Sequence, residues 1–198
     1  MKLRSLFFAV AAILFSTGMY AQAPPLSADQ VMSLAYQQAA KEKKNVLVIF
    51  HASWCVWCHR MDSSMADPTC KKFFDDNYVV RHLVVDESKD KKDLENPGAD
   101  EMRNKYGGKD LGIPYWLIFD ANGKLLANSR IKTNGSLTEM SGDNSGCPAS
   151  ANEVVYFINV LKKTSDLNTA QQAAIEKRFR DNEPRYAVIE KRLREKKR

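Results

Sequence analysis

The sequence predicts an α/β domain in which a central mixed sheet is flanked by helices. Helical and strand-like segments alternate along the first half of the chain, and residues 46–50 form a continuous apolar run. A strand that is apolar on both faces is typical of the middle of a sheet with helices on both sides. The pair Asn122-Gly123 lies between two later strand-like segments and predicts a hairpin, which adds an antiparallel pair to the sheet.

Local signals place the elements in order. Ser27 and Gln30 form a capping pattern and apolar residues then recur at helical spacing, which predicts a helix over residues 28–43. After the strand at 46–50, we predict a helix that ends near Met65 and continues from Asp67-Pro68 through Phe74, then a strand over 78–85. A short helix over 99–106 in a charged loop and two strands over 115–119 and 124–131 follow. The last predicted elements are an irregular loop over 133–149, a helix from Asn152, and a helical segment over 170–198 that is interrupted at Glu183-Pro184.

Composition divides the chain into three parts. Residues 1–23 have the basic start, short apolar stretch and small residues of a secretory signal peptide, so we expect a periplasmic or secreted protein; an uncleaved membrane anchor is the alternative. Residues 24–165 suit one domain. The 198-residue chain carries a net charge of +6, and its last 30 residues hold ten Lys and Arg against five Asp and Glu. We therefore expect a basic helical extension over 166–198 that packs on the domain, and no nucleic-acid partner.

Cys55 and Cys58 directly follow the buried strand and a four-residue turn. Their spacing lets both sulfurs meet in one helical turn, so the pair can form a disulfide and open it with little backbone movement. Cys55 precedes or opens a helix, where unpaired N–H groups and the helix dipole stabilise a thiolate, so it is the expected nucleophile. Cys58, expected to be more buried, would resolve the mixed disulfide. The pattern predicts thiol-disulfide exchange.

Over residues 28–163 the chain resembles the thioredoxin-like family. The resemblance rests on three features in the expected order, which are Trp54-Cys55-Val56-Trp57-Cys58 after a strand, a strand ending in Val85-Asp86, and Gly112-Ile113-Pro114 before a strand and an Asn-Gly hairpin. Residues 50–58 are similar to the exported branch that includes the C-terminal domain of DsbD. The resemblance implies a three-layer thioredoxin-like fold, protein thiols or disulfides as partners, no cofactor besides the redox-active disulfide, and a membrane reductant-relay protein as a further candidate partner.

The resemblance also implies which residues face the substrate. Pro114 is expected to be cis and to pack against the dithiol, and the backbone of Ile113 is expected to pair with the substrate. The alternative is a trans proline that only starts a strand. Trp54 is expected on the rim of a substrate groove. Val56 and Trp57 are candidate modulators of the dithiol, and Trp57 could belong either to the groove or to the packing.

One position departs from the family. Cytosolic thioredoxins bury an acid six residues before the first cysteine, where this chain has Ile49. Proton transfer must then use water or another group, and His51, His59 and His82 are the candidates. His59 is also a candidate modulator because it directly follows the dithiol. The missing acid and the resemblance to a reductant-relay branch favour a reductase or electron relay over an oxidase.

Three other functions fit parts of the pattern. Cys55, Cys58 and His59 match the attachment motif of c-type haem, with Met102 or Met140 as the second axial ligand, but haem does not explain the buried strand before the motif. A zinc site using the two cysteines and a neighbouring histidine lacks a second ligand pair, so we expect no metal. A thioredoxin-fold binding module with an incidental dithiol is the non-enzymatic alternative.

Cys70 and Cys147 are the other two cysteines. They could close a long loop as a structural disulfide in an oxidising compartment. Cys70 lies in a helical region and Cys147 in an irregular loop, so their sequence positions leave both the bridge and two free thiols open.

Overall fold

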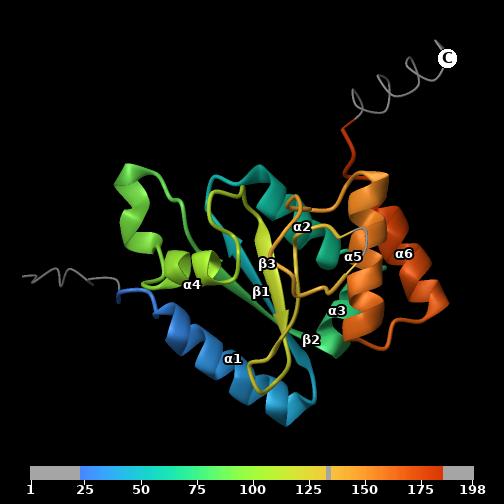
Figure 1. Cartoon of the computed structure of the whole chain (residues 1–198), viewed down its shortest axis with the longest axis horizontal. Helices are drawn as coiled ribbons and strands as arrows, with labels where there is room; N and C mark the ends of the chain where they lie inside the picture. Colours follow the sequence, from blue (N-terminus) through green and yellow to red (C-terminus); the bar gives the residue numbers. More distant parts are fainter. Residues whose placement is uncertain (1–22, 133–134, 185–198) are drawn as a thin grey trace, which may run out of the picture.

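We describe a computed structural model of the chain, which covers residues 23–132 and 135–184 (Figure 1). The predicted signal peptide, apart from Ala23, lies outside these residues, as does the end of the predicted extension from residue 185. Within the part described, no helix is long and apolar enough to cross a membrane.

Four strands form one mixed sheet in the order β2-β1-β3-β4. β1 (Asn45–His51) is parallel to β2 (Tyr78–Val84) and antiparallel to β3 (Tyr115–Phe119), which is antiparallel to β4 (Leu125–Asn128). The five apolar residues of β1 have no exposed surface. The predicted central position of this strand and the mixed character of the sheet are confirmed.

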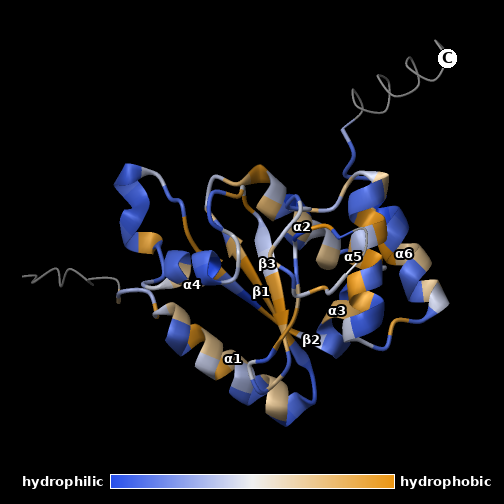
Figure 2. Ribbon diagram, in the orientation of Figure 1, coloured by the Kyte–Doolittle hydropathy of each residue, from blue (hydrophilic) through white to orange (hydrophobic). Residues whose placement is uncertain are grey.

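Helices cover both faces of the sheet (Figure 1). They are α1 (Ala28–Glu42), α2 (Val56–Met65), α3 (Lys71–Asn77), α4 (Ala99–Lys105), α5 (Ala151–Thr164) and α6 (Thr169–Arg180). Residues of α1 and α4 share one core with Val46, Val48 and Phe50, whereas residues of α2, α3, α5 and α6 share the other core with Leu47 and Ile49. Figure 2 shows the hydrophobic strands lying between these helices. This is the predicted three-layer thioredoxin-like fold.

Local sequence signals fixed most helix starts. The capping box predicted at Ser27 is formed, and Ser150 and Asn168 make equivalent boxes at α5 and α6. The predicted start of α3 at Pro68 is three residues early, because the Asp67 side chain accepts the N–H of Thr69 in a turn and the helix begins only at Lys71.

Two differences concern the loops. The predicted loop before α4 contains a short 3-10 helix, Lys89–Leu94. The strand predicted over 124–131 ends at Asn128, because the next residues pair with the following loop: the N–H of Ile131 donates to Asp143, and the N–H of Ser145 donates to Ser129, both at 2.7 Å. These bonds hold the 142–146 segment against the residues that follow β4.

The described part of the basic extension belongs to the core. Ile175 and Phe179 of α6 are fully buried in the same cluster as Phe74 and Phe157. The side chain of Arg178 contacts Asp67 at 3.2 Å, which ties α6 to the turn after α2. The expected packing of this segment on the domain is confirmed up to residue 184.

Candidate active site

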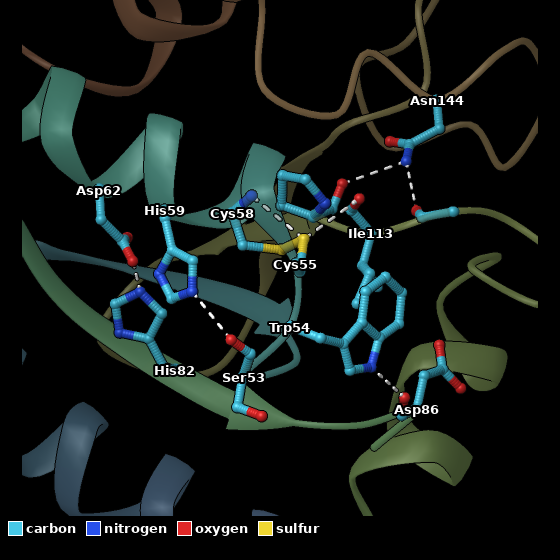
Figure 3. Close-up of a disulfide and its surroundings, with 12 residues drawn as sticks. Ser53, Trp54, Cys55, Cys58, His59, Asp62, His82, Asp86, Ile113 and Asn144 are labelled. Atoms are coloured by element: carbon cyan, nitrogen blue, oxygen red, sulfur yellow. Dashed lines mark hydrogen bonds and ion pairs between the residues drawn. A yellow bond between two sulfur atoms is a disulfide. The ribbon is translucent and has the colours of Figure 1, made fainter. Parts of the chain in front are cut away.

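Cys55 and Cys58 form a disulfide at the N-terminus of α2, with their Cα atoms 5.3 Å apart (Figure 3). Cys55 is the N-cap residue, and its Sγ accepts the backbone N–H of Cys58 at 3.1 Å. An N–H donor and the positive end of the helix dipole both favour negative charge on this sulfur after reduction. The structure therefore gives Cys55 the surroundings expected of the nucleophile.

Both cysteines are buried in the oxidised state. Cys55 is 2% exposed and Cys58 is 1% exposed, and they pack with Ala52 and Ile113. The predicted difference in burial between the two cysteines is therefore wrong for the disulfide form.

The loop before β3 lies against the disulfide. The Ile113–Pro114 peptide is cis, as predicted, and Pro114 is buried. The carbonyl oxygen of Ile113 is 3.6 Å from Sγ of Cys55. The oxidised sulfur carries no hydrogen, so this contact becomes a hydrogen bond only when Cys55 is a thiol. The two predicted substrate-side residues thus lie beside the expected nucleophile.

Three exposed apolar residues, Trp54, Val56 and Trp57, adjoin the two cysteines in the chain and form an apolar rim. The exposed fractions are 57% for Trp54, 61% for Val56 and 36% for Trp57. The indole N–H of Trp54 donates to the backbone carbonyl of Asp86 at 2.8 Å (Figure 3). The guanidinium of Arg60 lies 4.4 Å from the centre of the Trp57 ring, which supports a cation–π contact. Large apolar surfaces around a reactive disulfide are suited to binding polypeptide.

The sequence indicated Asp86 only as the end of a strand, and it pointed to no role for Arg103 or Glu87. Arg103 of α4 binds both carboxylate oxygens of Asp86, at 2.5 and 3.3 Å, and so holds the backbone that receives Trp54. Glu87 is 4% exposed and accepts both the N–H and the hydroxyl of Ser53. The acidic pair directly after a buried strand was the available signal, but its partners became evident only from the fold.

The position of the missing acid is filled by apolar packing, since Ile49 is fully buried. The nearest ionisable system on the same face of the sheet consists of His51 and His82, whose ring centres are 4.8 Å apart. His82 contacts the Asp62 carboxylate at 2.8 Å, and Asp62 lies one turn after Cys58 on α2. His59 donates its Nε2–H to the carbonyl of Ser53 at 2.9 Å, because a carbonyl can only accept.

His51 is expected to make stability depend on pH. Its Nδ1 is buried without a hydrogen-bond partner, and burial, followed by the charge of His82, lowers the pKa of His51 from its ordinary 6.5. Asp62 and Glu87 oppose this shift and His59 adds to it. The unfolded chain therefore binds a proton at His51 more readily than the folded protein does. The contribution of neutral His51 to stability is complete above the pKa that this residue has in the unfolded chain, and it is lost as the pH falls through that pKa and below it.

The measurement is the urea midpoint at pH 7.5 and pH 5.5. The wild-type midpoint should fall on acidification by more than the midpoint of His51→Phe, because a phenylalanine side chain cannot take up a proton. Equal falls in the two proteins would show that His51 is not the group responsible.

Cys70 and Cys147 are free thiols, so the candidate structural bridge is not formed. Both are buried, at 0% and 5% exposure, in the core shared by α2, α3, α5 and α6. Burial raises the pKa of Cys70 and raises that of Cys147 to about 12. Both thiols therefore stay protonated at neutral pH and make poor nucleophiles. Sequence spacing could not decide this, because a bridge depends on the distance between two packed side chains.

The geometry around Cys55 and Cys58 does not suit the haem alternative. Attachment of haem through Cys55 and Cys58 would require both sulfurs to face outward, whereas both are buried against Ile113. His59, the proposed axial ligand, is committed to the carbonyl of Ser53. Among residues 23–132 and 135–184, no group of three or more His, Cys, Asp or Glu side chains could hold a metal ion.

Residues 29–121 match the sequence model of a family described as thioredoxin-like. This part of the chain resembles that family. No curated protein sequence matches the chain. Among solved structures it is similar to a disulphide isomerase from Xylella fastidiosa Temecula1, with a TM-score of 0.42 and 22% identity over 51% of this chain and 72% of that one. It is also similar to a DsbH oxidoreductase, with a TM-score of 0.38 and 21% identity over 64% and 86%, and to tryparedoxin I from Leishmania major, with a TM-score of 0.34 and 22% identity over 43% and 67%.

The matched thioredoxin-like segment contains both cysteines of the disulfide and the Ile113–Pro114 loop that faces them. A Cys-x-x-Cys pair at a helix N-terminus can take up and release two electrons by thiol-disulfide exchange. The protein is a thiol-disulfide oxidoreductase of thioredoxin-like fold, a class that acts on protein thiols or disulfides. The finer resemblance to the DsbD branch stays a prediction.

Proposed function

We propose that this protein is an exported thiol-disulfide reductase or electron relay, which passes two electrons from its Cys55–Cys58 dithiol to disulfides in other proteins. The observation that carries the direction is the pair of contacts made by Sγ of Cys55: the amide of Cys58 at 3.1 Å and the carbonyl of Ile113 at 3.6 Å. The amide favours the thiolate, whereas the carbonyl favours the protonated thiol. Both partners are uncharged backbone groups, so the thiolate gains only moderate stabilisation.

Strongly oxidising pairs behave differently. Their reduced form is stabilised by a thiolate of very low pKa, which draws electrons onto the pair. The Cys55 sulfur has one hydrogen-bond donor and one opposing acceptor beside it, so the reduced dithiol should give electrons to a substrate more readily than a strongly oxidising pair does. This supports reduction of substrate disulfides over their formation.

The reaction proceeds in two exchanges. The Cys55 thiolate attacks a substrate disulfide, forming a bond to one substrate sulfur and releasing the other as a thiolate that takes up a proton. The Cys58 thiol then loses its proton to water or a nearby base and attacks Sγ of Cys55. The Cys55–Cys58 bond forms, and the second substrate sulfur leaves and is protonated. The enzyme is oxidised and the substrate is reduced by two electrons.

Another thiol protein must then restore the dithiol. We propose a membrane reductant-relay protein as this donor, because the apolar rim of Trp54, Val56 and Trp57 offers the same docking surface to donor and substrate. Export is supported by the signal-peptide pattern of residues 1–23. Mass spectrometry of the protein recovered from the periplasm or medium should find a mature N-terminus near residue 24.

The reduction potential of the Cys55–Cys58 pair tests the direction. Equilibration of the purified protein with a dithiothreitol redox buffer should give a value near that of thioredoxin, about −270 mV. A value near that of DsbA, about −120 mV, would instead assign the protein to disulfide formation. The Cys70→Ser and Cys147→Ser double variant serves as the control, because its two buried thiols should leave the measured potential unchanged.

A further inference from the structure

The loop between β4 and α5 contacts the segment beside the disulfide through the side chain of Asn144. Its amide nitrogen donates to the carbonyl of Gly112 at 2.6 Å and to the carbonyl of Pro114 at 3.1 Å. These two carbonyls flank Ile113, whose own carbonyl lies 3.6 Å from Sγ of Cys55 (Figure 3). One side chain thus holds both ends of the short segment that faces the reactive sulfur.

The orientation of Asn144 is itself fixed. Its side-chain oxygen accepts the backbone N–H of Gly146 at 3.1 Å. A flipped amide would place this oxygen against the two carbonyl oxygens and the NH2 group against the N–H of Gly146, so all three hydrogen bonds would be lost. An isolated backbone bridge between Arg130 and Asn144, together with the bond from the Ser145 N–H to the Ser129 carbonyl, ties the segment to the end of β4. The amide is therefore anchored to the sheet.

We propose that Asn144 is a positioning residue for protein substrates. By holding the carbonyls of Gly112 and Pro114, it keeps the backbone of Ile113 aligned to pair with an extended polypeptide beside Cys55. The proposal rests on the proposed function, because it concerns how a protein disulfide is bound. Asn144 makes no contact with either sulfur among its hydrogen bonds, so it acts through the 112–114 segment.

The alternative partner for these carbonyls is water. Gly112 is exposed, and without the amide its carbonyl would be solvated while the 112–114 segment sampled several orientations. A substrate chain would then have to order this segment as it binds, which weakens binding. Exchange between the dithiol and a small thiol needs no such pairing and would be unaffected.

Steady-state reduction of insulin, with dithiothreitol as the electron donor, provides the test. Asn144→Ala should raise KM for insulin about tenfold, as expected for the loss of two modest hydrogen bonds, while kcat stays within about twofold. The rate at which dithiothreitol alone reduces the Cys55–Cys58 disulfide should equal that of the wild type. Asn144→Asp, which keeps the shape of the side chain but turns an oxygen toward two carbonyls, should raise KM at least as much.

Arg130→Ala is the matched control. The Arg130 side chain anchors the same loop by donating to the carbonyls of Gly142 and Gly107, at 3.0 and 2.7 Å, and it makes no hydrogen bond to residues 112–114. Its KM for insulin should equal that of the wild type. An unchanged KM in both Asn144 variants, or an equal rise in Arg130→Ala, would overturn the proposal. A wild-type protein that does not reduce insulin at all would overturn the proposed function instead.

Discussion

Cys55→Ser should abolish disulfide reductase activity, lowering the rate of insulin reduction by about a thousandfold or more. Cys55 caps α2, and its sulfur lies beside the Ile113 carbonyl. A serine hydroxyl is far less acidic than a thiol, so it does not form the nucleophile at neutral pH. Cys58 is not expected to take over this role, because it lies inside the first turn of α2, whereas Cys55 caps the helix and lies beside the Ile113 carbonyl.

Cys58→Ser is the informative companion variant. It keeps the nucleophile but removes the resolving thiol, so the reaction should stop at a mixed disulfide between Cys55 and the substrate. Each enzyme molecule should then retain one substrate molecule, visible as a covalent complex on a non-reducing gel and absent from the Cys55→Ser, Cys58→Ser double variant.

The same pair of variants tests the non-enzymatic alternative, in which the dithiol is incidental to a binding module. Cys70 and Cys147 are the remaining cysteines, and both are buried free thiols. Activity that survives in Cys55→Ser would therefore come from another protein in the preparation or from unfolded chains, and the dithiol would be incidental to a binding module. A fully inactive Cys55→Ser with wild-type stability would assign the chemistry to this site.

The parts of the fold that the sequence predicted are those with local causes. The apolar run of β1 and the capping box at Ser27 each specify their element within a few residues, because hydrophobic burial on two faces and a reciprocal cap need no distant partner. The dithiol and the cis Pro114 were predictable from motif order. The structure adds that the cysteines are equally buried and that their rim is held by Asp86.

The parts that escaped prediction depend on contacts between distant segments. Asn144 lies in a stretch rich in Gly, Ser and Asn that looks like an ordinary loop, and only the pairing of this loop with the end of β4 brings its amide to Gly112 and Pro114. Arg103 is similar: it sits on a short charged helix, and its role appears when α4 packs beside the turn at Asp86. Sequence periodicity carries no information on such contacts.

The second large effect concerns the C-terminal helix. Phe179→Ala should lower the free energy of unfolding by about 3–5 kcal/mol, the usual cost of removing a fully buried phenylalanine. Phe179 has no exposed surface, and its ring centre lies 5.0 Å from that of Phe157 and 6.4 Å from that of Phe74. The measurement is urea unfolding followed by tryptophan fluorescence.

Lys177→Ala is the control on the same helix, because its side chain is 81% exposed and its ion pair with Asp181 is a surface contact. Its effect should stay within about 0.5 kcal/mol. Similar small effects of both substitutions would mean that α6 does not pack in solution. The expected result has a functional consequence, because α6 and the turn that follows it contact the α2 side of the domain: Arg178 of α6 contacts Asp67, and Asn182 of the turn donates to Ser64 of α2 at 2.9 Å. The basic composition of the C-terminal segment suggests a solvated tail, but its described part would then help to support α2, the helix that carries Cys58.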